Sequence, residues 1–145
     1  MKILILGQNG CVHAFTWKLL NSPQVMELVC APGNGGTAPL AAQVDLEQQA
    51  VNRMVEWCFQ EQFEMIVPVQ STALAAGLAD EGLSMQVAVC GPPQRSTILE
   101  RSRCQAKDFM LRHRLPTAPG RACGDIATAE RFLATQSPVS YTHLT

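Results

Sequence analysis

Two glycine-rich turns carry the groups in this sequence that are best suited to binding a ligand. They are the segments 7–10 (GQNG) and 31–37 (APGNGGT), and each follows a short apolar run that predicts a strand. In an open α/β sheet, ligands bind beyond the carboxyl ends of parallel strands. Glycines there let backbone N–H groups approach a phosphate, and the N-terminus of a following helix adds a partial positive charge. The two turns therefore predict a pocket for a small phosphorylated molecule.

The first turn has the spacing GxxG rather than GxGxxG, and no acidic residue ends the second apolar run to bind a ribose. This pattern favours a phosphate over a dinucleotide. The phosphate would be bound by the N–H groups of Asn9, Gly10 and Cys11. His13 falls in the first turn of the predicted helix, where it either points toward the strand ends or serves as a surface or packing residue.

The second turn combines several residue types that suit a binding loop. Pro32 and Gly33 favour a turn, and Asn34 offers amide donors and an acceptor. Gly35 and Gly36 leave the backbone open to a ligand. From the residues alone, an ordinary surface turn is the alternative interpretation.

Apolar periodicity predicts the elements that position these turns. Strands are expected at 2–6, 26–30, 64–69 and 86–90, with a short edge strand at 42–44. Helices are expected at 11–20, 45–60, 71–80, 94–100, 103–112 and 126–134. Alternating strands and helices with short connections predict an α/β fold with a parallel sheet flanked by helices.

The same pattern predicts details within the helices. The helix at 11–20 places Ala14, Trp17 and Leu20 along one face. Asp45 and Gln48 form a capping-box pattern at the start of the second helix. That helix is expected to bury five residues, Val51, Met54, Val55, Cys58 and Phe59. Gly82 closes the third helix, and Asp125 caps the last.

Composition and charge set wider limits. The chain is 47% apolar with a net charge of −1, which gives no indication of a nucleic-acid partner. Residues 1–90 hold three Lys/Arg and eight Asp/Glu, whereas residues 91–145 hold eight Lys/Arg and four Asp/Glu. The change falls at the Gly-Pro-Pro of 91–93, so we expect a first domain at 1–92 and a second element at 93–145. The basic part is either a solvated helix surface or a phosphate-binding one.

The cysteines and the hydropathy profile bear on location. The six cysteines show no CxxC pair and no spacing typical of metal ligands. Cys30, Cys58 and Cys90 lie in apolar runs and are expected to pack as small hydrophobic residues. We find no leader-like segment and no apolar run long enough for a bilayer. These features predict a cytoplasmic protein with no membrane partner.

Five segments together resemble a known family. They are the opening 1–20 (with Gly7, Gly10, His13, Ala14, Trp17, Lys18 and Leu19), the loop 31–38, and the segments 90–92, 99–103 and 106–110. The first two are similar to the N-terminal domain of phosphoribosylamine–glycine ligase, and the last three to the start of its ATP-grasp region. The resemblance runs from Met1 to about Pro138, which is the first third or so of a family enzyme.

The resemblance implies a Rossmann-like pre-ATP-grasp domain followed by an incomplete, helical start of an ATP-grasp domain. It implies ATP-dependent amide formation between glycine and 5-phosphoribosylamine in purine biosynthesis, with ATP and Mg²⁺. The resemblance implies a sugar-phosphate site for 5-phosphoribosylamine or glycinamide ribonucleotide, which in this chain consists of Gly7, Gly10, His13, Gly33, Asn34, Gly36 and Thr37. Arg103 and Lys107 are the implied ATP-binding residues. No catalytic residue and no metal ligand is implied, so we expect the chain alone to lack ligase activity.

Several positions depart from the family pattern. Cys11 and Val12 stand where the family has Arg and Glu, Ser71 replaces the glutamate of a Gly-Pro-Glu turn, and Arg103 replaces a lysine. Residues 140–145 do not resemble the family's next strand. These departures favour an alternative function, a stand-alone sugar-phosphate-binding or scaffold module that has lost catalysis. Another ATP-grasp ligase is a third possibility, which the loop at 31–38 argues against.

Overall fold

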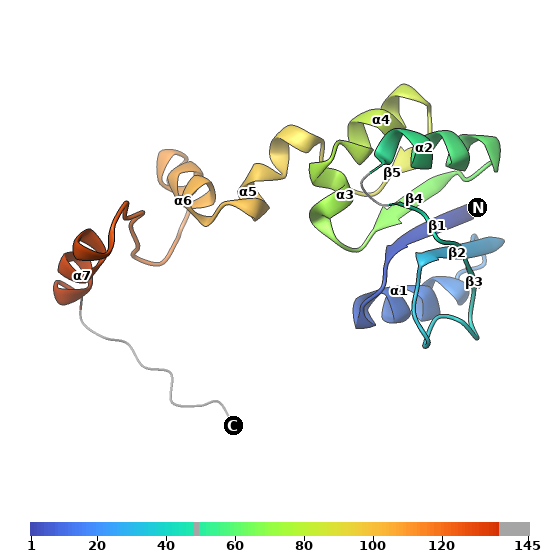
Figure 1. Cartoon of the computed structure of the whole chain (residues 1–145), viewed down its shortest axis with the longest axis horizontal. Coiled ribbons are helices and arrows are strands. Elements are labelled where there is room, and N and C mark those ends of the chain that lie inside the picture. Colours follow the sequence, from blue (N-terminus) through green and yellow to red (C-terminus); the bar gives the residue numbers. More distant parts are fainter. Residues whose placement is uncertain (48–49, 137–145) are drawn as a thin grey trace. The chain divides into compact units, whose positions relative to one another are not determined.

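The computed structural model describes residues 1–47 and 50–136. Residues 2–89 contain a five-stranded, all-parallel sheet in the order β3-β2-β1-β4-β5 (Figure 1). The strands are β1 (Lys2–Gly7), β2 (Glu27–Pro32), β3 (Ala42–Gln43), β4 (Met65–Pro68) and β5 (Ala88–Val89). The predicted α/β class, the parallel sheet and the short edge strand are confirmed.

The central strand β1 explains how two cores form. Leu4 and Leu6 face one side of the sheet, and Ile3 and Ile5 face the other, because successive side chains alternate along a strand. Burial on both faces requires a continuous apolar run, which is typical of parallel sheets. The larger core also contains Val29, Ala31, Val51, Met54, Val55, Cys58, Phe63, Ile66, Ala73, Leu78 and Val87. The smaller core adds Val12, Leu28 and Cys30.

Helices cover these cores on both faces of the sheet (Figure 1). They are α1 (Gly10–Leu20), α2 (Val51–Gln60), α3 (Ser71–Ala75) and α4 (Leu78–Ser84). The helix α1 lies on the face of the smaller core, and α2, α3 and α4 lie on the face of the larger one. On the larger-core face, the half-buried Trp57 of α2 packs against Phe63, with ring centroids 5.1 Å apart.

The buried face of α1 differs from the predicted one. Val12 and Thr16 are buried, whereas Trp17 is 60% exposed and Leu20 is 43% exposed. The stripe that packs on the sheet is offset from the apolar stripe. Thr16 can lie there because its hydroxyl donates to the Val12 carbonyl at 2.7 Å and lies within hydrogen-bond distance of the Cys30 sulfur, at 3.3 Å. Apolar spacing alone therefore pointed to the wrong face.

The start of α2 and one of its predicted core residues also require correction. The helix begins at Val51 after Ala50, which makes no side-chain cap, and Asp45 lies in a loop before it. Gln48, the other half of the predicted capping box, lies outside the described residues. Phe59 is 59% exposed because it sits next to the buried stripe that ends at Cys58.

The predicted helix at 71–80 is two helices. Gly77, with φ +101°, separates α3 from α4, and this left-handed conformation suits glycine. Gly82 lies inside α4 rather than after it. A methyl group there would lie 2.8 Å from the Val87 carbonyl oxygen, so the glycine allows α4 to approach the chain before β5.

The structure divides the chain into two compact units, Met1–Ile98 and one that begins at Leu99. The predicted domain boundary after residue 92 stays a prediction. Following the sheet are a 3-10 helix η1 (Gln94–Ser96), α5 (Ile98–Arg101), α6 (Arg103–Arg112) and α7 (Ile126–Ala134). Asp125 caps α7 as predicted, because its carboxylate accepts from the Thr128 N–H at 2.7 Å. Within the described ranges, no helix is long and apolar enough to span a membrane.

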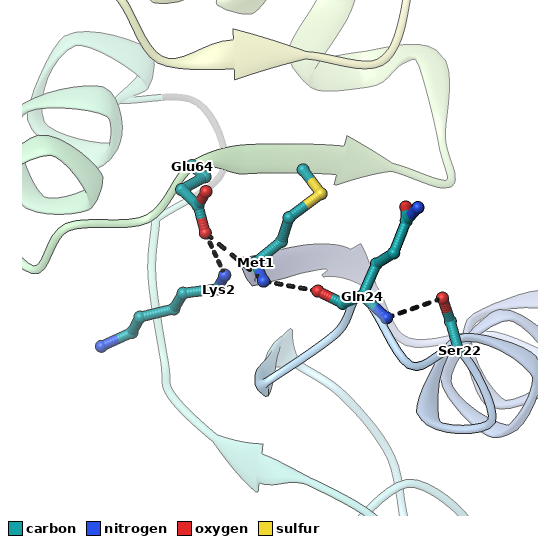
Figure 2. Close-up of polar contacts among 5 residues, drawn as sticks. All are labelled: Met1, Lys2, Ser22, Gln24 and Glu64. Atoms are coloured by element: carbon teal, nitrogen blue, oxygen red, sulfur yellow. Dashed lines mark hydrogen bonds and ion pairs between the residues drawn. The ribbon is translucent and has the colours of Figure 1, made fainter.

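Polar contacts hold the amino ends of the central strands (Figure 2). The Glu64 carboxylate accepts from the Lys2 N–H at 2.7 Å and lies 3.6 Å from the Met1 ammonium group. The same ammonium group donates to the Gln24 carbonyl, and the Lys2 ammonium group lies 3.3 Å from Glu27. These contacts join the amino end of β1 to the neighbouring segments, at the opposite end of the strands from the two glycine-rich turns.

Candidate functional site

The carboxyl ends of β1 and β2 place the two glycine-rich turns side by side. Gly7 and Pro32 are register partners, and the Gly33 N–H donates to the Gly7 carbonyl at 3.0 Å. Both glycines have a positive φ, +139° at Gly7 and +76° at Gly33. A methyl group on Gly7 would lie 2.7 Å from a methyl group of Val12. The predicted adjacency of the turns is therefore present and depends on glycine at both positions.

Asn34 joins one turn to the other. Its Nδ2 donates to the carbonyls of Gln8 (3.2 Å) and Asn9 (3.1 Å) in the first turn. Its Oδ1 accepts from the N–H groups of Gly36 (2.8 Å) and Thr37 (3.1 Å) in its own loop. The amide thus makes four hydrogen bonds within the protein. Its place in the candidate site is to fix the two backbones at which a ligand would bind.

Thr37 is fully buried and also supports the loop. Its hydroxyl donates to the Asn34 carbonyl at 2.9 Å and accepts from the Asn34 N–H at 2.8 Å. Gln43 of β3 donates to the Thr37 hydroxyl at 2.8 Å and to the Asn34 carbonyl at 2.7 Å. Sequence reasoning missed Gln43. A polar residue in the edge strand just after the loop was the available signal.

The surface that remains for a ligand consists of the start of α1 and the glycines of the second loop. Gly10, Cys11, Gly35 and Gly36 are exposed. Asn9 caps α1 by accepting from the Val12 N–H at 3.2 Å. The first N–H groups of a helix have no partner within the helix and favour an anion.

His13 extends from α1 to the second loop. A methyl group on Gly36 would lie 3.2 Å from Cδ2 of the His13 ring, so the exposed imidazole packs over this glycine. The side chain lies against the second loop and is exposed, so the structure is compatible with both interpretations that the sequence left open. Whether it binds a ligand stays a prediction.

The departures from the family pattern leave this site without formal charge. Val12 is fully buried in the smaller core, Cys11 is an exposed thiol, and Ser71 is half-buried at the start of α3. The described segments 7–13 and 33–37 contain no Lys, Arg, Asp or Glu. An anion here would be bound by backbone N–H groups, the helix dipole and His13.

Arg103 and Lys107 lie together in the second unit, as their spacing of one helical turn requires. They line a cavity of about 500 Å³ with Cys104, Ala118, Pro119, Gly120, Arg121 and Ala122. The Lys107 ammonium group donates to the Thr117 hydroxyl at 3.1 Å and to the Ala118 carbonyl. The cavity suits a phosphate because its charged lining residues are all cations. ATP binding there stays a prediction.

The cysteines and acidic residues form no further centre in the described part of the chain. No group of three or more His, Cys, Asp or Glu side chains could hold a metal ion there. Cys30 and Cys58 are fully buried as expected, and burial raises the pKa of the Cys58 thiol to about 12. Cys90 is exposed, contrary to the prediction, because β5 ends one residue earlier, at Val89.

Comparisons with known proteins agree on one family. Residues 1–100 match the family described as "Phosphoribosylglycinamide synthetase, N domain". The phosphoribosylamine–glycine ligase of Nostoc sp. is 33% identical over 138 residues, covering 94% of this chain and 32% of the relative. That of Allochromatium vinosum is 40% identical over 120 residues, covering 81% and 28%.

The crystal structure of phosphoribosylamine–glycine ligase from Thermotoga maritima matches with a TM-score of 0.59 and 28% identity. The match covers 82% of this chain and 26% of that structure. The chain spans about a third of the length of the curated relatives it matches.

Proposed function

This chain belongs to the phosphoribosylglycinamide synthetase N-domain family, and on that premise we propose that it supplies the sugar-phosphate-binding part of a phosphoribosylamine–glycine ligase. The observation that carries the proposal is the joining of the two glycine-rich turns by Asn34 beside the start of α1. A phosphate at this position meets the N–H groups of Gly10 and Cys11 and the positive end of the helix dipole. The reaction belongs to purine biosynthesis, and a cytoplasmic location stays part of the proposal.

The proposed reaction joins glycine to 5-phosphoribosylamine. ATP transfers its γ-phosphoryl group to the glycine carboxylate, which gives an acyl phosphate and ADP. The amine then attacks the acyl carbon, and inorganic phosphate leaves as the amide forms. The first unit of this chain contributes binding of the sugar phosphate, and His13 orients it from above Gly36.

Arg103 and Lys107 fit the phosphates of ATP, because their cavity has no acidic side chain among its described lining residues. ATP supplies the phosphoryl group, and these two cations would neutralise part of its charge. The described residues offer no ligand cluster for Mg²⁺, so no step of the proposal passes through the metal ion.

The alternative is a sugar-phosphate-binding or scaffold module without catalysis. The specific observation in its favour is that the first turn is uncharged. Val12 is buried there, and the Cys11 thiol cannot offer a phosphate the paired N–H donors that an arginine would. Under this alternative the pocket persists, and the ligase reaction does not occur in any assembly that contains the chain.

Ligand-induced thermal stabilisation of the 145-residue chain tests the proposed pocket. Ribose 5-phosphate and glycinamide ribonucleotide should each raise the unfolding temperature, and His13→Gln should reduce that increase severalfold. His113→Gln is the matched control, because His113 is an exposed histidine of the second unit. If no sugar phosphate raises the unfolding temperature of the wild-type chain, the proposed pocket is rejected. Stabilisation by the nucleotide, without turnover when the part of a relative that this chain does not cover is added, would favour the binding module.

A further inference from the structure

Two neighbouring cavities of the second unit share one arginine. Arg121 lines the cavity of Arg103 and Lys107, and it also lines a second cavity of about 370 Å³. The other residues of the second cavity are Thr128, Arg131, Phe132 and Thr135 of α7 and its C-terminal end. Arg121 lies on the segment between α6 and α7 and is the lining residue common to both cavities.

The position of Arg121 follows from a contact of Lys107. The Lys107 ammonium group donates to the Thr117 hydroxyl and the Ala118 carbonyl, which ties the 117–122 segment to α6. A methyl group on Gly120 would lie 3.4 Å from the Lys107 ammonium nitrogen, so the chain passes close to that side chain. The contacts of Lys107 with the 117–120 segment therefore place the following residue, Arg121, close to the cations of α6.

The charges around the two cavities have one sign. Among the described lining residues, four are Lys or Arg and none is Asp or Glu. Two acidic residues lie close in sequence to the second cavity without lining it: Glu130 is exposed beside Arg131, and Asp125 accepts from the N–H and hydroxyl of Thr128 as the α7 cap. The Arg131 guanidinium donates to the Thr128 hydroxyl at 3.2 Å through one nitrogen, and a guanidinium has five N–H donors in all.

We propose that Arg121 is a third phosphate-binding cation, and that the two cavities it lines together bind the polyphosphate chain of a nucleoside di- or triphosphate. A monophosphate is neutralised by two cations. A triphosphate carries enough charge and length to engage Arg103 and Lys107 in the first cavity, the shared Arg121, and Arg131 in the second cavity. Arginine also binds phosphate oxygens through two parallel N–H groups. This inference rests on the assignment of Arg103 and Lys107 to ATP phosphates in the proposed function.

Calorimetric titration of the 145-residue chain with inorganic tripolyphosphate at fixed ionic strength tests the inference. We expect Arg121→Gln to weaken binding about tenfold, the scale of a lost charge-assisted contact. Arg101→Gln should change it less than twofold, because Arg101 is an exposed arginine that lines neither cavity. Inorganic monophosphate should bind more weakly than tripolyphosphate. Circular dichroism checks that each variant keeps its helices.

The outcomes separate this inference from the proposed function. If Arg121→Gln binds like wild type while Arg103→Gln and Lys107→Gln lose affinity, the inference is overturned and the two-cation ATP site stands. If none of the three variants loses affinity, both assignments fail. A single-stranded oligonucleotide that displaces tripolyphosphate at lower concentration would overturn the inference in favour of a nucleic-acid surface.

Discussion

The two candidate phosphate sites of this chain consist of different chemical groups: backbone N–H groups in the first unit and cationic side chains in the second. The site in the first unit consists of backbone groups fixed by the amides of Asn34 and Gln43, and its segments carry no formal charge. The site in the second unit consists of long cationic side chains on α6, on the 117–122 segment and on α7. Of the described residues in α6 and α7, none is buried. The first site therefore depends on the fold, whereas the second depends on charge and is sensitive to salt.

Asn34→Ala should have the largest effect and would show how far the first site depends on its loop. The substitution removes four hydrogen bonds and leaves backbone groups without partners, so we expect the free energy of unfolding to fall by about 3 kcal/mol. Urea unfolding followed by tryptophan fluorescence measures it. Asn52→Ala, at an exposed position of α2, is the control. An equal, small loss in both variants would mean that the loop does not fix this edge of the sheet.

Gly33→Ala should destabilise the first unit by about 2 kcal/mol, because alanine is strained at a φ of +76°. Its methyl group would also lie 2.6 Å from Nε2 of Gln43 and 2.7 Å from Oγ1 of Thr37. Gly35→Ala is the matched control in the same loop, since a methyl group there meets no atom within 4 Å. Thermal unfolding of both variants measures the difference. Equal unfolding temperatures would show that the loop has no fixed conformation.

The larger core of the first unit should respond to alkaline pH through Cys58. Burial raises the pKa of this thiol to about 12 in the folded chain, while the unfolded chain ionises near the ordinary value of 9.0. The folded state then holds the extra proton between these values, so stability is full below pH 9 and falls as the pH rises. We expect a loss of about 1 kcal/mol near pH 10.

Urea unfolding near pH 8 and near pH 10 measures this loss, and Cys58→Ala should remove most of the difference between the two conditions. Cys90→Ala, at an exposed cysteine, should retain it. A Cys58→Ala variant with an unchanged pH response would assign the effect to another group.

The smallest effect is expected in the second unit, at acid pH. The N–H of Thr128, then its hydroxyl, donates to the Asp125 carboxylate and holds its pKa below the ordinary value. Because the pKa is lowered on folding, the carboxylate stabilises α7 above its ordinary pKa, and this contribution is lost as the pH falls through the lowered value.

Amide exchange of Thr128 measured by NMR should therefore quicken at acid pH in the wild-type chain. Asp125→Asn keeps a side-chain acceptor without a titrating group and should show a smaller change, whereas Asp108→Asn on α6 should behave like wild type. Identical acid responses of wild type and Asp125→Asn would contradict the assignment.

Much of the first site could be predicted because its signals are local. Apolar runs predicted β1, β2 and β4, and glycines at their ends predicted the two turns. Asp125 was correctly predicted as a cap, since its acceptor and the N–H it binds are three residues apart. What could not be predicted depends on contacts between distant segments.

The direction of the Asn34 amide is one such feature, because it is set by carbonyls 25 and 26 residues away in sequence. Gln43 joins the loop only once β3 pairs with β2. The face of α1 was wrong for a related reason. Apolar spacing identifies the most apolar face of a helix, but the face of α1 that packs on the sheet is the one with Val12 and Thr16.

The two tryptophans of the chain lie in opposite surroundings. Trp57 is half-buried against Phe63 and the larger core, whereas Trp17 is 60% exposed on α1, the helix that begins at the candidate site. The chain therefore carries two tryptophan fluorophores, one on the surface of α1 and one against the larger core. A soluble quencher should quench Trp17 fluorescence in the folded state, and it should quench Trp57 fully only after the larger core unfolds. The emission of Trp17 therefore reports on α1, and that of Trp57 reports on the fold.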